Sequence, residues 1–147
     1  MTTYYAEQSK SYWPVVDAKA AGSVKAVRGV FALTAALALN DVINMLSMPA
    51  QHVPVDCILD CDDLDSGGSP SITLSVGTAT TPALLISASA VGQAGGIARM
   101  DKATGPRLAA SNSDTLIQIK VAAGPATGAT TGTIGLTLLY RPVQANE

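Results

Sequence analysis

The sequence predicts an all-β domain, either a sandwich or a barrel, and two observations carry this prediction. Apolar residues alternate with polar residues at a period of two in several short runs, as they do in strands with one buried face. Clusters of Gly, Pro, Ser, Thr and Asp separate the runs, and these residues favour turns. The length of 147 residues suits a single domain, because a chain of this size buries roughly 68–70% of its unfolded surface and needs no disulfide or metal to fold.

The N-terminal part of the chain differs from the rest of it. Residues 1–22 show no period of 2 or 3.6, and Pro14 interrupts them. We therefore expect an extended N-terminal arm over residues 1–22, a β-sandwich domain over residues 23–142, and a C-terminal tail over residues 143–147.

The arm carries four of the six aromatic residues of the chain: Tyr4, Tyr5, Tyr12 and Trp13. Each such side chain can bury roughly 150–250 Å², so it either folds back on its own domain or anchors a neighbouring subunit. Tyr and Trp are enriched at protein interfaces. These four residues are therefore the candidate partner-binding residues.

The first three strand-like runs cover residues 23–33, 41–49 and 52–61. The first run overlaps an Ala- and Leu-rich stretch that could form a helix, but Gly29 and the β-branched valines favour a strand. The second is apolar and ends at a proline. In the third, alternation predicts that one set of side chains faces the core and the other faces solvent: Val53, Val55, Cys57, Leu59 and Cys61 against His52, Pro54, Asp56, Ile58 and Asp60.

Four further runs cover residues 71–77, 83–89, 114–123 and 132–142. The buried faces expected in the alternating runs are Ile72, Leu74 and Val76; Ile117, Ile119 and Val121; and Ile134, Leu136, Leu138 and Tyr140. Two segments rich in Gly, Ala and Thr, residues 87–106 and 122–132, are expected to form loops or poor strands, the second of them a hairpin connection.

The stretch DCILDCDDLDSGG, residues 56–68, holds both cysteines and invites a metal or redox interpretation. On a strand, Cys57 and Cys61 lie about 13 Å apart at about 3.3 Å per residue, which is too far for a disulfide or a shared zinc. We expect both to be buried thiols. Asp62, Asp63 and Asp65 miss the spacing of a calcium-binding loop; a looser calcium cluster is the alternative to a simple turn.

No pattern of catalytic residues is present. His52 is the single histidine, and it is predicted to point away from the cysteines on one strand. The sequence contains no G-x-S-x-G elbow and no phosphate-binding glycine loop of the G-x-x-x-x-G-K-[ST] kind. We therefore expect no catalytic residues, no metal site and no cofactor.

The charge pattern argues against two classes of partner. The nine Lys and Arg residues are scattered rather than clustered, unlike the basic surfaces that bind nucleic acid. No apolar run approaches the roughly 20 residues of a membrane span, and the N-terminus lacks a signal-peptide pattern. The two cysteines therefore indicate free thiols made in a reducing cytoplasm. Arg99, Lys102 and Arg107 lie near one another in sequence, in a solvated loop or against an acidic partner surface.

Charged residues make up only 14% of the chain, whereas globular domains usually carry about 25%. Two explanations fit this observation. Part of the surface is covered by copies of the chain or by a partner, or Ser, Thr, Ala and Gly simply cover the surface.

Several motifs together resemble a known family. They are ALNDVINMLSMPAQHVPVDCILDCDDLDSG, SITLSVG, GQAGG and SDTLIQIKVAAGPATGATTGTIGLTLLYRP, within residues 23–142. The chain is similar to small structural proteins of tailed bacteriophages, in particular capsid decoration or cement proteins. This resemblance implies an antiparallel, jelly-roll-like β-sandwich that sits on the virion surface after synthesis in the host cytoplasm. It also implies a homotrimer that bridges neighbouring subunits of the major capsid protein.

These observations leave three functional hypotheses. The leading one is a non-enzymatic decoration protein that stabilises a phage capsid, with the aromatic arm as a capsid-gripping segment. The alternative is a receptor- or glycan-binding sandwich module of a phage head or tail. An enzyme is the third, and no catalytic pattern in the sequence favours it.

Overall fold

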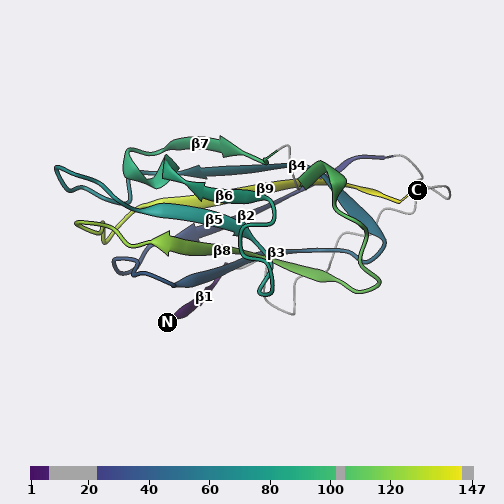
Figure 1. Cartoon of the computed structure of the whole chain (residues 1–147), viewed down its shortest axis with the longest axis horizontal. Helices are drawn as coiled ribbons and strands as arrows, with labels where there is room; N and C mark the ends of the chain where they lie inside the picture. The colour runs from purple at the N-terminus through teal and green to yellow at the C-terminus, as the bar shows by residue number, and fades with distance from the viewer. Residues whose placement is uncertain (7–22, 102–104, 144–147) are drawn as a thin grey trace.

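The computed structural model describes residues 1–6, 23–101 and 105–143. They form two β-sheets packed face to face, with the strands running along the long axis of the molecule (Figure 1). Sheet A has the strand order β1 (Thr3–Tyr5), β3 (Val42–Met48), β8 (Thr115–Ala123), β5 (Thr73–Gly77) and β6 (Ile86–Ser89). Sheet B has the order β2 (Lys25–Ala32), β9 (Thr133–Pro142), β4 (His52–Cys61) and β7 (Gly96–Arg99).

The chain passes back and forth between the two sheets. Each successive strand lies in the other sheet, apart from the neighbours β5 and β6. The pairs are antiparallel except for β1, which runs parallel to β3. The prediction of an all-β, antiparallel, jelly-roll-like sandwich is therefore confirmed, and the overlapping helix alternative is wrong because residues 25–32 form β2.

The core lies between the sheets and is built from the alternating side chains of the long strands. All the inward residues predicted for the runs 71–77, 114–123 and 132–142 are at most 1% exposed. Leu64 and Leu85, which lie in connections between strands, are also 1% exposed. Non-directional burial of these apolar side chains is the main term that holds the two sheets together.

The two sheets approach closely where β2 passes β3. Gly29 faces inward, and a Cβ atom at this position would lie 2.6 Å from the Met45 carbonyl oxygen. The pairing of β3 with β8 shifts register between Asn44 and Leu46, so Met45 is the extra residue of a β-bulge. Only a residue without a side chain fits between the sheets at this point.

A second bulge overturns the predicted faces at the start of β4. The pairing of β4 with β9 shifts register between Pro54 and Asp56, which leaves Val55 as an extra residue. Because one extra residue moves all the preceding side chains to the opposite face, His52 and Pro54 are buried, while Val55 is 41% exposed. The prediction that Val53 and Val55 face the core is therefore wrong, whereas the prediction for the three residues after the bulge, Cys57, Leu59 and Cys61, is confirmed.

The described residues of the Gly- and Ala-rich segment 87–106 form short elements rather than a plain loop, in line with the poor strands that were the other expectation. It contains a short 3₁₀ helix, η2 (Ala90–Gln93), the edge strand β7, and a second 3₁₀ turn, η3 (Gly105–Arg107). Ser89 caps η2, since its hydroxyl oxygen accepts a hydrogen bond from the Val91 N–H at 3.3 Å. After β7 the chain continues beside β4, where the Met100 N–H donates to the Cys57 carbonyl at 2.8 Å.

Candidate functional site

Two of the four predicted partner-binding residues lie on β1, at the edge of sheet A. The strand is held by hydrogen bonds from the Val42 N–H to the Thr2 carbonyl at 3.0 Å and from the Ala6 N–H to the Asn44 carbonyl at 2.7 Å. Tyr4 points inward, with its ring centroid 5.4 Å from that of Phe31 on β2. Tyr5 points the other way and is 56% exposed. Tyr4 thus folds back on its own domain, and Tyr5 is available to a neighbour.

The other two predicted residues, Tyr12 and Trp13, lie outside the described residues. The structure therefore brings Tyr4 and Tyr5 onto one strand and shows nothing of the rest of the predicted set.

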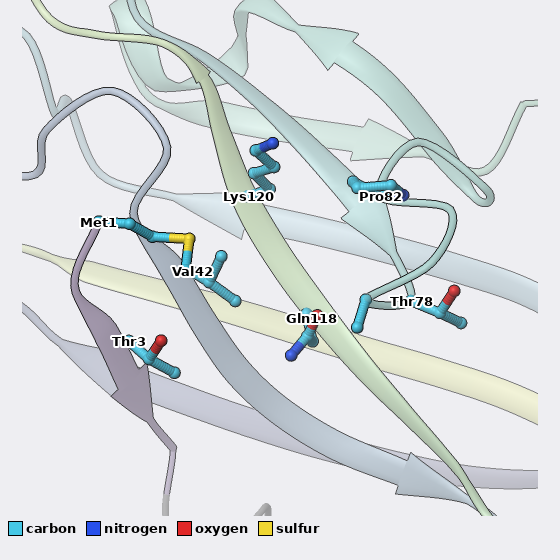
Figure 2. Close-up of a pocket in the computed structure, with 8 residues that line it drawn as sticks. Met1, Thr3, Val42, Thr78, Pro82, Gln118 and Lys120 are labelled. Atoms are coloured by element: carbon cyan, nitrogen blue, oxygen red, sulfur yellow. The ribbon is translucent and has the colours of Figure 1, made fainter.

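A shallow hollow lies beside β1 on the outer face of sheet A. Figure 2 shows its walls, with Thr3 and Val42 on one side, Thr78 and Pro82 on the other, and Gln118 and Lys120 between them. Its volume is about 220 Å³, below the range of roughly 300–1,000 Å³ that is usual for small-molecule sites. Lys120 is the single charged side chain among the residues that line it. The hollow suits a side chain of a partner better than a cofactor.

The cysteines in the stretch 56–68 are buried and unpaired, as predicted. Cys57 is 0% exposed and Cys61 is 9% exposed, and neither forms a disulfide. Burial raises the pKa of Cys57 to about 12 and that of Cys61 to about 11, and neighbouring aspartates reinforce both shifts. The nucleophilic and metal-binding form of cysteine is the thiolate, so both residues are inert at neutral pH.

The aspartates of the same stretch do not converge on a common point. The Asp62 carboxylate accepts a hydrogen bond from the Thr133 N–H at 2.8 Å, and the Asp63 carboxylate accepts one from the Asp65 N–H at 2.9 Å. Within the described residues, no group of three or more His, Cys, Asp or Glu side chains is arranged to hold a metal ion. These aspartates lie in the connection that follows β4, and one carboxylate among them is buried, which the sequence did not predict.

That carboxylate belongs to Asp65, which is 1% exposed. It accepts hydrogen bonds from four backbone N–H groups: those of Ser71 at 2.7 Å, Ile72 at 3.2 Å, Ala126 at 2.9 Å and Thr127 at 2.8 Å. Desolvation alone would raise the pKa of Asp65, but these donors together lower it well below its usual range. Asp65 therefore ties the turn after β4 to the connection between β8 and β9. Aspartate commonly satisfies nearby backbone N–H groups in turns, and this tendency was the available sequence clue.

His52 is buried rather than solvent-facing, because of the bulge at Val55. Its Nδ1–H donates to the Ala50 carbonyl at 2.8 Å, since a carbonyl oxygen only accepts. Its ring packs edge-on against Tyr140 at a centroid distance of 5.3 Å. The Nε2 atom is buried and has no hydrogen-bond partner among the described residues. His52 now lies on the same inner face as Cys57, but the two residues are five positions apart on β4. The contacts of His52 are with Ala50 and Tyr140, as expected of a packed core residue.

The outer face of sheet B carries two ion pairs. Arg28 on β2 contacts Asp60 on β4 through two hydrogen bonds, at 2.6 and 2.8 Å, and reaches the Thr137 hydroxyl at 3.0 Å. The pair lies directly over Gly135 of β9, where a Cβ would come within 2.3 Å of the Arg28 guanidinium. The hydrogen bond from Arg28 lowers the pKa of Asp60. Arg99 forms the second pair, with Asp56. These charges neutralise one another within the sheet.

Apolar side chains lie exposed on the same face. Val30 and Val55 are each 41% exposed, and Ile97 on β7 is 71% exposed. Isolated exposed apolar residues are ordinary, but here three lie on the same face as two ion pairs whose charges neutralise each other. This combination favours contact with another protein surface.

Fold and surface together define a class: a small two-sheet β-sandwich with exposed apolar side chains and ion-paired charges on the outer face of one sheet. No helix among the described residues is long and apolar enough to cross a membrane.

Comparison with solved structures identifies the family within this class. A chain of the structure described as the capsid of Ralstonia phage GP4 is 37% identical, covers 98% of this chain and 100% of its own length, and superposes with a TM-score of 0.88. The chain therefore belongs to the family of phage capsid proteins that this structure represents. No family model matches the sequence, and no curated protein matches it.

Two further structures have the same fold. A chain in the capsid asymmetric unit of cyanophage Pam1 is 29% identical, with a TM-score of 0.74 over 93% of this chain and 99% of its own length. A chain from the acid-stable capsid structure of Helicobacter pylori bacteriophage KHP30 is 14% identical, with a TM-score of 0.51 over 82% of this chain and 95% of its own length. The last similarity concerns the fold alone.

Proposed function

We propose that this protein is a non-enzymatic structural protein of the virion, which decorates a phage capsid and stabilises it by bridging neighbouring subunits of the major capsid protein. The observation that carries the proposal is the end-to-end match, at 37% identity, to a chain of the Ralstonia phage GP4 capsid. The match includes both sheets, so the whole domain and not a shared fragment supports a capsid role.

The mechanism is burial of surface across subunit junctions. A standard stable interface buries roughly 1,200–2,000 Å², and repetition of the same contact over a shell adds avidity. The surface of this protein supports such a role because charged residues are few, at 14% of the chain, and the ion pairs of sheet B are satisfied internally. Assembly as a homotrimer would multiply these contacts further.

The N-terminal segment supplies the aromatic contacts of this proposal. Tyr5 is the described aromatic residue best placed for it, because its side chain is 56% exposed at the edge of sheet A. Tyr12 and Trp13 are included in the proposed contact from the sequence alone. Tyr4 acts indirectly, since its packing on Phe31 holds β1 in place.

The proposal is tested with the full-length protein and capsids of the same phage that lack it. The purified protein is measured by light scattering alone, which gives its oligomeric state, and is then titrated onto the capsids. We expect a trimer that saturates the shells at a fixed stoichiometry and raises the temperature at which they dissociate. Failure to bind the shells would contradict the proposal, and specific binding to host glycans by the isolated protein would favour a receptor-binding role in its place.

A further inference from the structure

A groove of about 630 Å³ runs along the first half of β4. Its lining includes Val53 and Val55 of β4, Arg141 of the neighbouring strand β9, and Arg107 and Leu108 at the end of η3. The volume falls in the range of roughly 300–1,000 Å³ that is usual for binding sites. It is therefore large enough to receive several side chains of a partner. We call it the bulge groove.

The bulge in β4 creates the apolar part of this groove. Because the register shifts between Pro54 and Asp56, Val53 and Val55 point out of the sandwich instead of into its core. Val55 is 41% exposed as a result. Bulges commonly re-aim side chains at functional positions, and this one turns two valines toward a surface groove.

Gln51, the residue before β4, connects three segments beside the groove by hydrogen bonds. The Gln51 N–H donates to the Ser111 carbonyl at 2.8 Å, and the Gln51 amide donates to Asn112 Oδ1 at 2.6 Å. The Val143 N–H in turn donates to the Gln51 carbonyl at 3.0 Å. Gln51 itself has a positive φ of 59°. These contacts fix the start of β4 relative to the residues that follow η3 and β9.

The charged side chains that line the bulge groove are of one sign among the described residues. They are two arginines, Arg107 and Arg141, and the described lining contains no aspartate or glutamate. Arg28 and Arg99 elsewhere on sheet B each have a carboxylate partner, whereas Arg107 is exposed and has no carboxylate partner in the part of the chain that the structure describes. Arg141 donates to the Pro142 carbonyl at 3.2 Å, which ties its guanidinium to the end of β9.

We infer that the bulge groove receives an acidic segment of a neighbouring capsid subunit. Arg107 binds a carboxylate of that segment, because the guanidinium fork matches a carboxylate with two parallel hydrogen bonds. Val53, Val55 and Leu108 receive an adjacent apolar side chain. The inference rests on the proposed function for the identity of the partner, and on charge complementarity for its chemistry.

Two substitutions in the groove test the inference in the full-length protein. Val55→Asp places a carboxylate where an acidic segment must bind, and Arg107→Glu reverses the charge of an exposed residue outside the strands. Leu39→Asp is the matched control for the first, because Leu39 is an apolar residue that is 55% exposed in the connection between β2 and β3, away from the groove. Lys25→Glu, a charge reversal on β2 at a residue that lines neither the groove nor the hollow of sheet A, is the matched control for the second.

Binding is measured by co-sedimentation with capsids that lack the protein, at two salt concentrations. We expect each groove variant to bind at least tenfold more weakly than the wild type and each control to bind within about twofold of it. Raising the salt should weaken the wild type more than Arg107→Glu, because a charge contact has been removed from the variant. If Val55→Asp fails to fold, Arg107→Glu and its control decide the question.

Several outcomes would overturn the inference. The inference is wrong if the groove variants bind capsids as tightly as their controls. It is also wrong if the controls lose as much affinity as the groove variants. A groove variant whose oligomeric state changes in the absence of capsids would show that a second copy of this chain is the occupant. Wild-type protein that binds no capsid would refute the proposed function itself, whereas normal binding by the groove variants would refute the groove inference alone.

Discussion

Gly29→Ala is the most direct test of how closely the two sheets pack. The added Cβ would lie 2.6 Å from the Met45 carbonyl oxygen, whereas ordinary contacts begin near 3.4 Å. The sheets must therefore separate locally by about 0.8 Å, or the bulge in β3 must move by that amount. A gap of about 0.5–1 Å forfeits a quarter to a half of the dispersion energy of each affected contact.

The expected loss of stability results from two opposing terms. Overpacking of a close-packed core costs about 1–3 kcal/mol, and the upper part of that range applies because the atom met is a backbone carbonyl that cannot rotate away. Replacing glycine in a strand by alanine recovers about 0.5–1 kcal/mol of backbone entropy. We therefore expect Gly29→Ala to lower the free energy of unfolding by about 2 kcal/mol, which corresponds to a fall in Tm of about 4–8 °C for a domain of this size.

Urea unfolding followed by circular dichroism measures this change, and Gly68→Ala is its control. A Cβ at Gly68 meets nothing within 4 Å, and its φ lies outside the left-handed region, so we expect a free energy of unfolding equal to or slightly above that of the wild type. The reasoning is refuted if Gly29→Ala lies within about 0.5 kcal/mol of the wild type, the usual range of neutral surface changes. It is also refuted if both variants lose the same amount.

Three further predictions concern the turn, the thiols and the N-terminal strand. Asp65→Asn should lower Tm most at neutral pH and least in acid. The pKa of Asp65 is lower in the folded protein than in the unfolded chain, so its carboxylate adds stability that is complete above the unfolded pKa of about 3.9 and is lost as the pH falls below it. A Tm difference between variant and wild type that does not change with pH would contradict this. Cys57 and Cys61 should resist a thiol reagent at pH 8 in the native protein and react fully in denaturant, since burial raises both pKa values; rapid labelling of the native protein would contradict their burial. Tyr4→Ala should lower the free energy of unfolding by about 1–2 kcal/mol through loss of the contact with Phe31. Tyr5→Ala should leave the free energy of unfolding unchanged and weaken capsid binding. Equal effects of the two changes in both assays would argue against separate roles for these tyrosines.

The alternation of apolar and polar side chains predicted most of what could be inferred about the fold from the sequence. The runs at residues 71–77, 114–123 and 132–142 each have the predicted buried face. This pattern is reliable because successive side chains of a strand point to opposite faces. The same argument separated the two cysteines and assigned them to the core, which the structure confirms.

Alternation failed where an extra residue entered a strand. Val53 and Val55 look like core residues in the sequence, but the bulge before Asp56 turns them outward and buries His52. Pro54 is a local clue, because proline within a sheet is largely confined to edge strands, strand starts and bulges, but it does not show which residue is the extra one. The shift is decided by the pairing of β4 with β9, a strand about 80 residues further along the chain.

The sequence also did not predict that the Asp65 carboxylate is a buried hydrogen-bond acceptor. Its four backbone donors come from the turn that it begins and from the connection at residues 126 and 127, about 60 positions away. One member of an aspartate cluster becomes a buried hydrogen-bond centre because these donors meet in space, and its neighbours Asp62 and Asp63 stay on the surface.

The sequence by itself determined the class of fold, the buried faces of most strands and the absence of any recognisable catalytic motif, because each of these depends on local alternation or residue type. The tertiary structure alone decided the order of the strands, the parallel attachment of β1 to β3, the close approach at Gly29 and the groove beside β4. These features depend on which distant segments pair and in which register. A one-residue shift in that register moves a valine from the core to the surface where we infer that a partner binds.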